Sequence, residues 1–121
     1  MRRAFCLLIS LISAGCDASH VDDVPMIWVL NEPREFHGVR VRLRGICRIE
    51  FEGNALYLSR ASYADRFGKQ AIWLNIGWPV TPEVLKLDGH EVSVEGTFDA
   101  DAKGHLGAFA GSLTEVRLSQ R

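Results

Sequence analysis

The stretch VRVRLRGICRIEFEGNALYLSR, Val39 to Arg60, has the most regular pattern in the chain and decides the predicted fold. Apolar or small residues occupy every odd position from 39 to 51, and charged residues occupy most of the even positions. Because side chains on a strand alternate between its two faces, this pattern predicts a long, half-buried strand. The predicted inward residues are Val39, Val41, Leu43, Gly45, Cys47, Ile49 and Phe51.

Beyond this strand the alternation resumes with the opposite parity, as a hairpin requires. Gly53-Asn54 is predicted to form a two-residue turn, because glycine adopts the unusual dihedral angles that such turns need. This turn pairs Glu50 with Tyr57 and places Leu56 on the inward face of the second strand. A polar loop is expected over residues 59–69.

The rest of the domain contains three further alternating runs, at 70–77, 90–98 and 106–118, which predict three more strands. A bulge is expected near the end of the last one. Thr81 as a cap and Pro82 at the first helical position predict a short helix between the third and fourth strands. Another short helix is predicted within residues 26–37. This order is that of the OB-fold, a mainly β, five-stranded barrel. The alternatives are another small barrel or an open meander crossed by a helix.

The N-terminal segment has the pattern of an export signal. Arg2 and Arg3 precede an apolar run that is too short to span a bilayer stably, and the run ends in SAGC, Ser13 to Cys16. This motif resembles the lipobox of bacterial lipoproteins. The resemblance implies removal of residues 1–15 and attachment of diacylglyceryl and palmitate chains to Cys16. Residues 16–25 then read as the lipidated cysteine and a polar tether, and residues 26–121 as the domain. A signal peptide without lipidation and a retained signal anchor are the alternatives.

Several motifs in the domain also resemble a family of short uncharacterised bacterial proteins. These motifs are EPREFHGVRVRLRG (32–45), EFEGNALYL (50–58), AIWL (71–74), VEGTF (94–98) and GHLGAFAGSL (104–113). The resemblance implies the OB-like fold and a bacterial source, and it brings no activity.

No catalytic pattern is evident in the sequence, so we expect neither an enzyme nor a cofactor. The four histidines form no pair at metal-ligand spacing, so no metal site is predicted. Cys47 falls on the inward face, where a free cysteine fills space as a small apolar group. Glu50 and Glu52 resemble a glycosidase pair only by proximity, since a hairpin surface offers no cleft between them.

The outward face of the first hairpin is the candidate ligand face. Its residues are Arg44, Arg48, Glu50, Tyr57 and Trp73. OB-folds bind oligonucleotides and oligosaccharides on the face of strands two and three, which here would carry Tyr57 and Trp73, and aromatic rings stack on the ligand there. The competing interpretation is a solvated sheet in which the arginines pair with acidic residues of the fourth strand, such as Glu95. The two large aromatic rings should be covered by residues 59–69, by the N-terminal helix or by a partner, and the hypothesis is that a partner protein or a glycan covers them.

These observations predict a non-catalytic binding or interaction module of the bacterial cell envelope. It would be held to a membrane through Cys16 and face the periplasm or the exterior. The chain has 14 basic and 15 acidic residues, which gives no overall attraction to nucleic acid. An envelope protein or a glycan is the expected partner. An accessory substrate-binding subunit of an envelope enzyme and a structural spacer are the alternatives.

Overall fold

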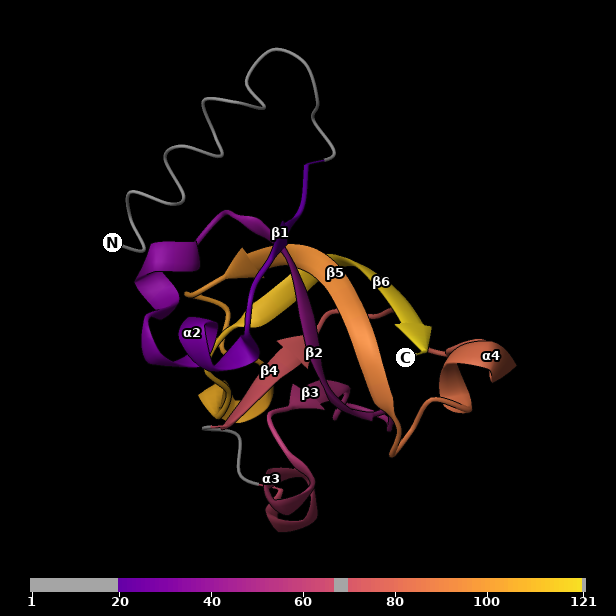
Figure 1. The fold of residues 1–121 in the computed structure, drawn as a ribbon. Coiled ribbons are helices and arrows are strands. Elements are labelled where there is room, and N and C mark those ends of the chain that lie inside the picture. Colours follow the sequence, from indigo (N-terminus) through magenta and orange to yellow (C-terminus); the bar gives the residue numbers. More distant parts are fainter. Residues whose placement is uncertain (1–19, 67–69, 121) are drawn as a thin grey trace.

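A computed structural model describes residues 20–66 and 70–120 (Figure 1). The predicted signal peptide and Cys16 lie outside these residues. Among the described residues, no helix has the length and apolar character needed to cross a bilayer. The strands are β1 (Asp22–Asp23), β2 (Arg40–Arg48), β3 (Ala55–Tyr57), β4 (Ala71–Leu74), β5 (Glu91–Asp99) and β6 (Ser112–Gln120). The α-helices are α2 (Met26–Asn31), α3 (Arg60–Asp65) and α4 (Pro82–Leu85), and the 3-10 helices are η1 (Pro33–Phe36) and η3 (His105–Gly107).

The strands β2 to β6 form a closed barrel with the order β2-β3-β4-β6-β5 and a further ladder from β5 back to β2. The pairings are antiparallel except for the parallel contact between β4 and β6. This is the predicted OB-like arrangement. The helix α4 lies between β4 and β5, as predicted, and the Thr81 hydroxyl accepts a hydrogen bond from the Val84 N–H at its start. The side-chain cap explains why the helix begins there.

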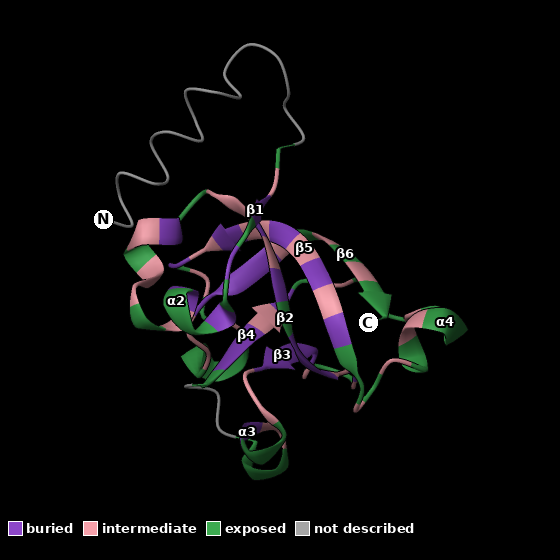
Figure 2. Cartoon of the chain, in the orientation of Figure 1, coloured by how far each residue is buried: buried purple, intermediate pink, exposed green. Residues whose placement is uncertain are grey.

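The barrel interior holds the main core, and the predicted alternation describes it well. On β2, Val41, Leu43 and Cys47 are fully buried. On β5, buried residues alternate with partly exposed ones along the strand, as the banding in Figure 2 shows. The core is completed by Phe36 of η1 and by Val29 of α2, both almost completely excluded from solvent. The short N-terminal helices therefore close one end of the barrel.

The predicted two-residue turn at Gly53-Asn54 is wrong. The strand β2 ends at Arg48, and the observed register pairs Arg48 with Ala55 and Ile46 with Tyr57. Residues 49–54 therefore form a longer loop, which is held by a hydrogen bond from the Glu50 N–H to the Asn54 side chain (3.0 Å). The register differs from the predicted one by an even number of residues, so every strand residue keeps its predicted face. Phe51, which was expected inside, is 63% exposed.

Three other boundaries differ from the prediction. The folded part begins before residue 26, because β1 pairs in parallel with β2 and Val24 enters the core. Residues 22–25 therefore belong to the domain and not to a tether. The predicted loop at 59–69 contains the helix α3, whose start is stabilised by a reciprocal capping box between Ser59 and Ser62. The last strand begins at Ser112, and its expected bulge is present opposite Glu95 and Thr97 of β5.

Candidate functional site

An open cleft of about 190 Å³ lies on the outer face of β2 and β3. The floor is formed by Arg48 and Tyr57 from these two strands. One wall is the loop 49–54, which contributes Glu50 and Glu52. The opposite wall is the segment between β5 and β6, where Leu106 and Phe109 line the cleft. In an OB-fold, the usual binding region is the face of the second and third barrel strands together with the loops between strands one and two and between strands four and five. The walls of the cleft come from these two loops, and its floor includes Tyr57 from β3, the second barrel strand.

Arg48 is the central polar group of the floor. Its side chain is only 11% exposed, and its guanidinium lies over the Tyr63 ring of α3 at 3.9 Å from the ring centre. The Tyr57 ring lies on β3, at 5.5 Å from the same group. Arg48 Nη2 also donates a hydrogen bond to the Tyr63 backbone carbonyl. The Nε atom is buried without a hydrogen-bond partner among the described residues. Cation–π contacts and a charged hydrogen bond therefore fix Arg48 against α3.

Glu50 links two guanidinium groups at the edge of the cleft. Its Oε1 atom accepts a hydrogen bond from Arg66 Nη2 (2.8 Å) and lies 3.7 Å from Arg48 Nη1. Glu52 is exposed on the same loop, with a positive φ of 55°. Two arginines and two glutamates thus meet in one small cleft, and their formal charges cancel.

The two aromatic residues of the predicted ligand face point outward, as expected, but they are not free for stacking. Tyr57 is 3% exposed and meets Tyr63 edge-on at 5.8 Å between ring centres. Trp73 is half-buried and meets Phe109 edge-on at 5.3 Å. The rings are covered by α3, which lies in the segment 59–69, and by the segment before β6. A ligand could not stack on Tyr57 without displacing Tyr63. Tyr57 is therefore not an exposed stacking group, which corrects the expectation for the ligand face.

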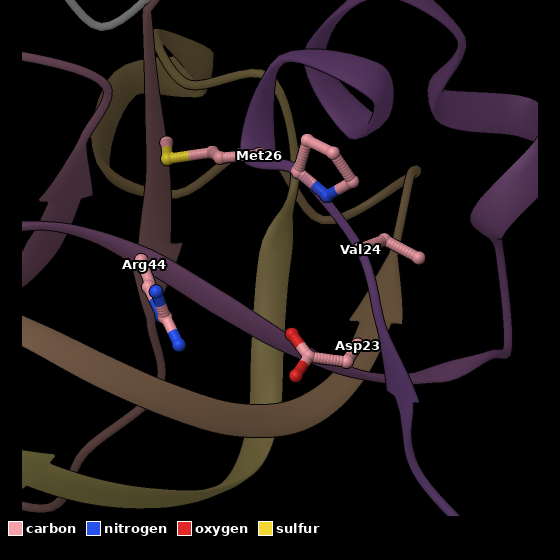
Figure 3. A pocket seen from close by; sticks show the side chains of 5 residues that line it. Asp23, Val24, Met26 and Arg44 are labelled. Carbon is pink, nitrogen blue, oxygen red and sulfur yellow. The ribbon is translucent and has the colours of Figure 1, made fainter.

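The arginines on the outward face of β2 contact different parts of the protein. Arg42 pairs with Glu95 across the β2–β5 ladder, at 2.8 Å, as the charge-paired interpretation predicted. This hydrogen bond raises the pKa of Arg42 and lowers that of Glu95. Arg44 does not reach the cleft. It is exposed and lines a separate open depression of about 330 Å³ with residues 23–26 (Figure 3). Of the predicted ligand face, only Arg48, Glu50 and Tyr57 line the cleft.

Two other groups of chemically reactive side chains lie outside the cleft, namely Cys47 and the cluster of His37, Asp99 and Asp101. Burial raises the pKa of the Cys47 thiol to about 12, with a smaller contribution from Asp88, so the thiolate nucleophile is scarce at neutral pH. His37, Asp99 and Asp101 bring atoms that could ligate a metal within 4.8 Å of one another. However, His37 Nδ1 accepts a hydrogen bond from the Ala100 N–H (3.0 Å), and Asp101 accepts one from Arg34 (2.6 Å).

The sequence did not identify the residues that complete the cleft. Tyr63 and Arg66 come from the predicted loop 59–69, and Phe109 comes from the start of the predicted last strand, which the structure places before β6. The serines at positions 59 and 62 could have indicated the helix that carries Tyr63, because their side chains cap its start. No known protein family, curated protein or solved structure matches the chain.

Proposed function

We propose that this protein is a non-catalytic binding module of the bacterial cell envelope, tethered to a membrane by acyl chains on Cys16. The cleft around Arg48 is its binding site. The observation that carries this proposal is the position of the cleft, over β2 and β3 and between the loop 49–54 and the segment before β6. The two loops are those that OB-folds use for ligands, and Tyr57 of the floor comes from β3, the second barrel strand, which belongs to the usual binding face.

The arrangement of charges favours binding over catalysis. The Glu50 carboxylate contacts both Arg48 and Arg66, so it is committed to holding these groups in place. A general acid or base needs a carboxyl group that is free to exchange a proton with the substrate. The balanced charges also disfavour nucleic acid, whose binding depends on a basic surface.

The lipid tether is tested by labelling cells with a radioactive fatty acid and by detergent phase partition. The wild-type protein should carry the label and enter the detergent phase, whereas Cys16→Ser should do neither. Full partition of the unlabelled wild type into the aqueous phase would refute the tether.

The binding site is tested by NMR titration of the full-length protein in micelles of a sugar-free detergent. Two neutral tetrasaccharides, tetragalacturonate and inorganic phosphate serve as probes. At least one probe should cause saturable shifts at Glu52, Arg66 and Leu106, which line the cleft. If none of the four shifts these residues, the cleft is not the binding site.

A further inference from the structure

The geometry points to a neutral, hydroxyl-rich ligand for the cleft, namely a short uncharged oligosaccharide. One sugar ring would occupy the cleft, and a neighbouring ring would stack on the exposed aromatic pair Phe51 and Trp78. This inference rests on the proposed function, because it assigns a ligand class to the same site.

The first argument is electrostatic. Glu50 already neutralises Arg48 and Arg66, so an anionic ligand would have to compete with a carboxylate held at 2.8 Å from Arg66. A cationic ligand would have to compete with the two guanidinium groups in the same way. A neutral ligand can instead use the cluster as it stands. Arg66 is 57% exposed and its guanidinium has five N–H donors, while the exposed Glu52 carboxylate offers acceptors. Sugar hydroxyls can both donate and accept, so they match such a mixed set.

The second argument concerns the aromatic pair beside the cleft. Phe51 stands in the sequence between Glu50 and Glu52 of the cleft wall; its own ring does not line the cleft and is 63% exposed. Its ring meets Trp78 edge-on at 5.7 Å, and Trp78 is 45% exposed. Contiguous exposed apolar patches on a monomer often mark binding sites, and these two rings are in contact with each other. A sugar ring has apolar C–H faces and a polar rim, which fits an aromatic surface next to converging polar groups. Because Tyr63 covers Tyr57, this pair supplies an accessible stacking surface that the strands do not.

The third argument is size. The cleft measures about 190 Å³. At about 30 Å³ for each water molecule, this space corresponds to roughly six waters, which suits a single sugar ring. The cleft is open, so a longer chain can extend beyond it.

The inference is tested with cellotetraose and fully N-acetylated chitotetraose as neutral probes in the titration described above. Both the cleft residues and the loops that hold Phe51 and Trp78 should shift, with saturation in the millimolar range or tighter. Tetragalacturonate should bind about tenfold more weakly than the better neutral probe, because its carboxylates compete with Glu50.

Two matched pairs of variants locate the binding. Glu52→Gln should weaken binding of the neutral probe by about fivefold or more, whereas Glu83→Gln on α4 should leave it within about twofold. Trp78→Ala should likewise weaken binding, whereas Trp28→Ala should not. Trp28 is a fair control because it is 42% exposed, nearly the same as Trp78, but lies on α2. Unchanged circular dichroism would show that the variants are folded.

The outcomes separate the two proposals. Preferential binding of tetragalacturonate or phosphate at the cleft would overturn the neutral-ligand inference and leave the binding site standing. Failure of both neutral probes to saturate the cleft at about 10 mM would also overturn the inference, since such affinity is too weak for recognition. If no probe shifts the cleft residues, the proposed function fails together with the inference.

Discussion

Replacement of Gly45 by alanine should destabilise the barrel strongly, because two strands approach each other closely at this position. A Cβ atom on Gly45 would lie 2.5 Å from the Tyr57 carbonyl oxygen and 2.9 Å from Leu56 Cγ. The oxygen belongs to the backbone of β3, which is paired on both sides, and Leu56 is fully buried. The strands would therefore have to separate by roughly 0.5 Å or more, which disturbs a close-packed core.

The expected cost can be estimated from two opposing effects. Overpacking of a core costs about 1–3 kcal/mol, and a backbone clash belongs in the upper part of that range. Loss of glycine entropy in the unfolded chain returns about 0.4–1 kcal/mol. We therefore expect a net loss of about 2 kcal/mol, which lowers Tm by about 8–16 °C in a domain of this size.

The assay is urea denaturation followed by circular dichroism, with Gly77→Ala as the control. A Cβ on Gly77 would meet no atom within 4 Å, so this variant should be neutral or slightly stabilised. Equal unfolding free energies of the two variants, within about 0.5 kcal/mol, would refute the close approach of β2 and β3.

Three further predictions concern individual side chains. Arg48→Met should lower the free energy of unfolding by about 1–3 kcal/mol, because the Tyr63 carbonyl loses a charged donor. Arg48→Lys should restore part of this free energy. An unchanged urea midpoint in Arg48→Met would contradict the prediction. The buried Cys47 thiol, with its pKa raised to about 12, should react with a thiol reagent only after unfolding. Rapid labelling of the native protein at Cys47, read by peptide mass spectrometry, would show that the thiol is accessible. The hydrogen bond from Arg42 lowers the pKa of Glu95 below its ordinary value of 4.5. The ionised Glu95 therefore stabilises the folded protein above pH 4.5, and this stabilisation is lost as the pH falls through the lowered pKa. The difference in Tm between wild type and Glu95→Gln should therefore shrink from about pH 7 to about pH 3, and a constant difference would argue against the ion pair.

The alternating pattern of the strands was sufficient to predict the barrel and most of its inward residues, with Phe51 as an exception. It could not fix the hairpin register, because an even shift preserves every side-chain face. The register depends on Asn54, whose side chain accepts the Glu50 N–H and so stabilises a longer loop. Nothing in the periodicity of residues 49–54 distinguishes this loop from a tight turn.

The candidate site was predicted in part. Arg48 and Glu50 were placed on the correct face, and the need for a cover over Tyr57 was anticipated. The covering residues Tyr63 and Phe109 were not found, because each acts through a single tertiary contact. Tyr63 lay in a predicted loop, and Phe109 lay in a run that was predicted as a strand but precedes β6. For the same reason, the role of Arg66 in the cleft could only be seen once α3 was placed beside β2.

The ladder that closes the barrel also has a consequence for the rate of folding. It joins β2 to β5, and its Arg42–Glu95 pair links residues 53 positions apart in the sequence. The β2–β3 hairpin can form early, since its loop 49–54 is short, but closure must first overcome the entropy of a long loop. Folding should therefore be governed by the meeting of β2 and β5, on the millisecond-to-second scale of barrels rich in distant contacts. Until that event, the inward residues of both strands remain in water, and the open edge of β2 is the place where a nascent chain would pair wrongly.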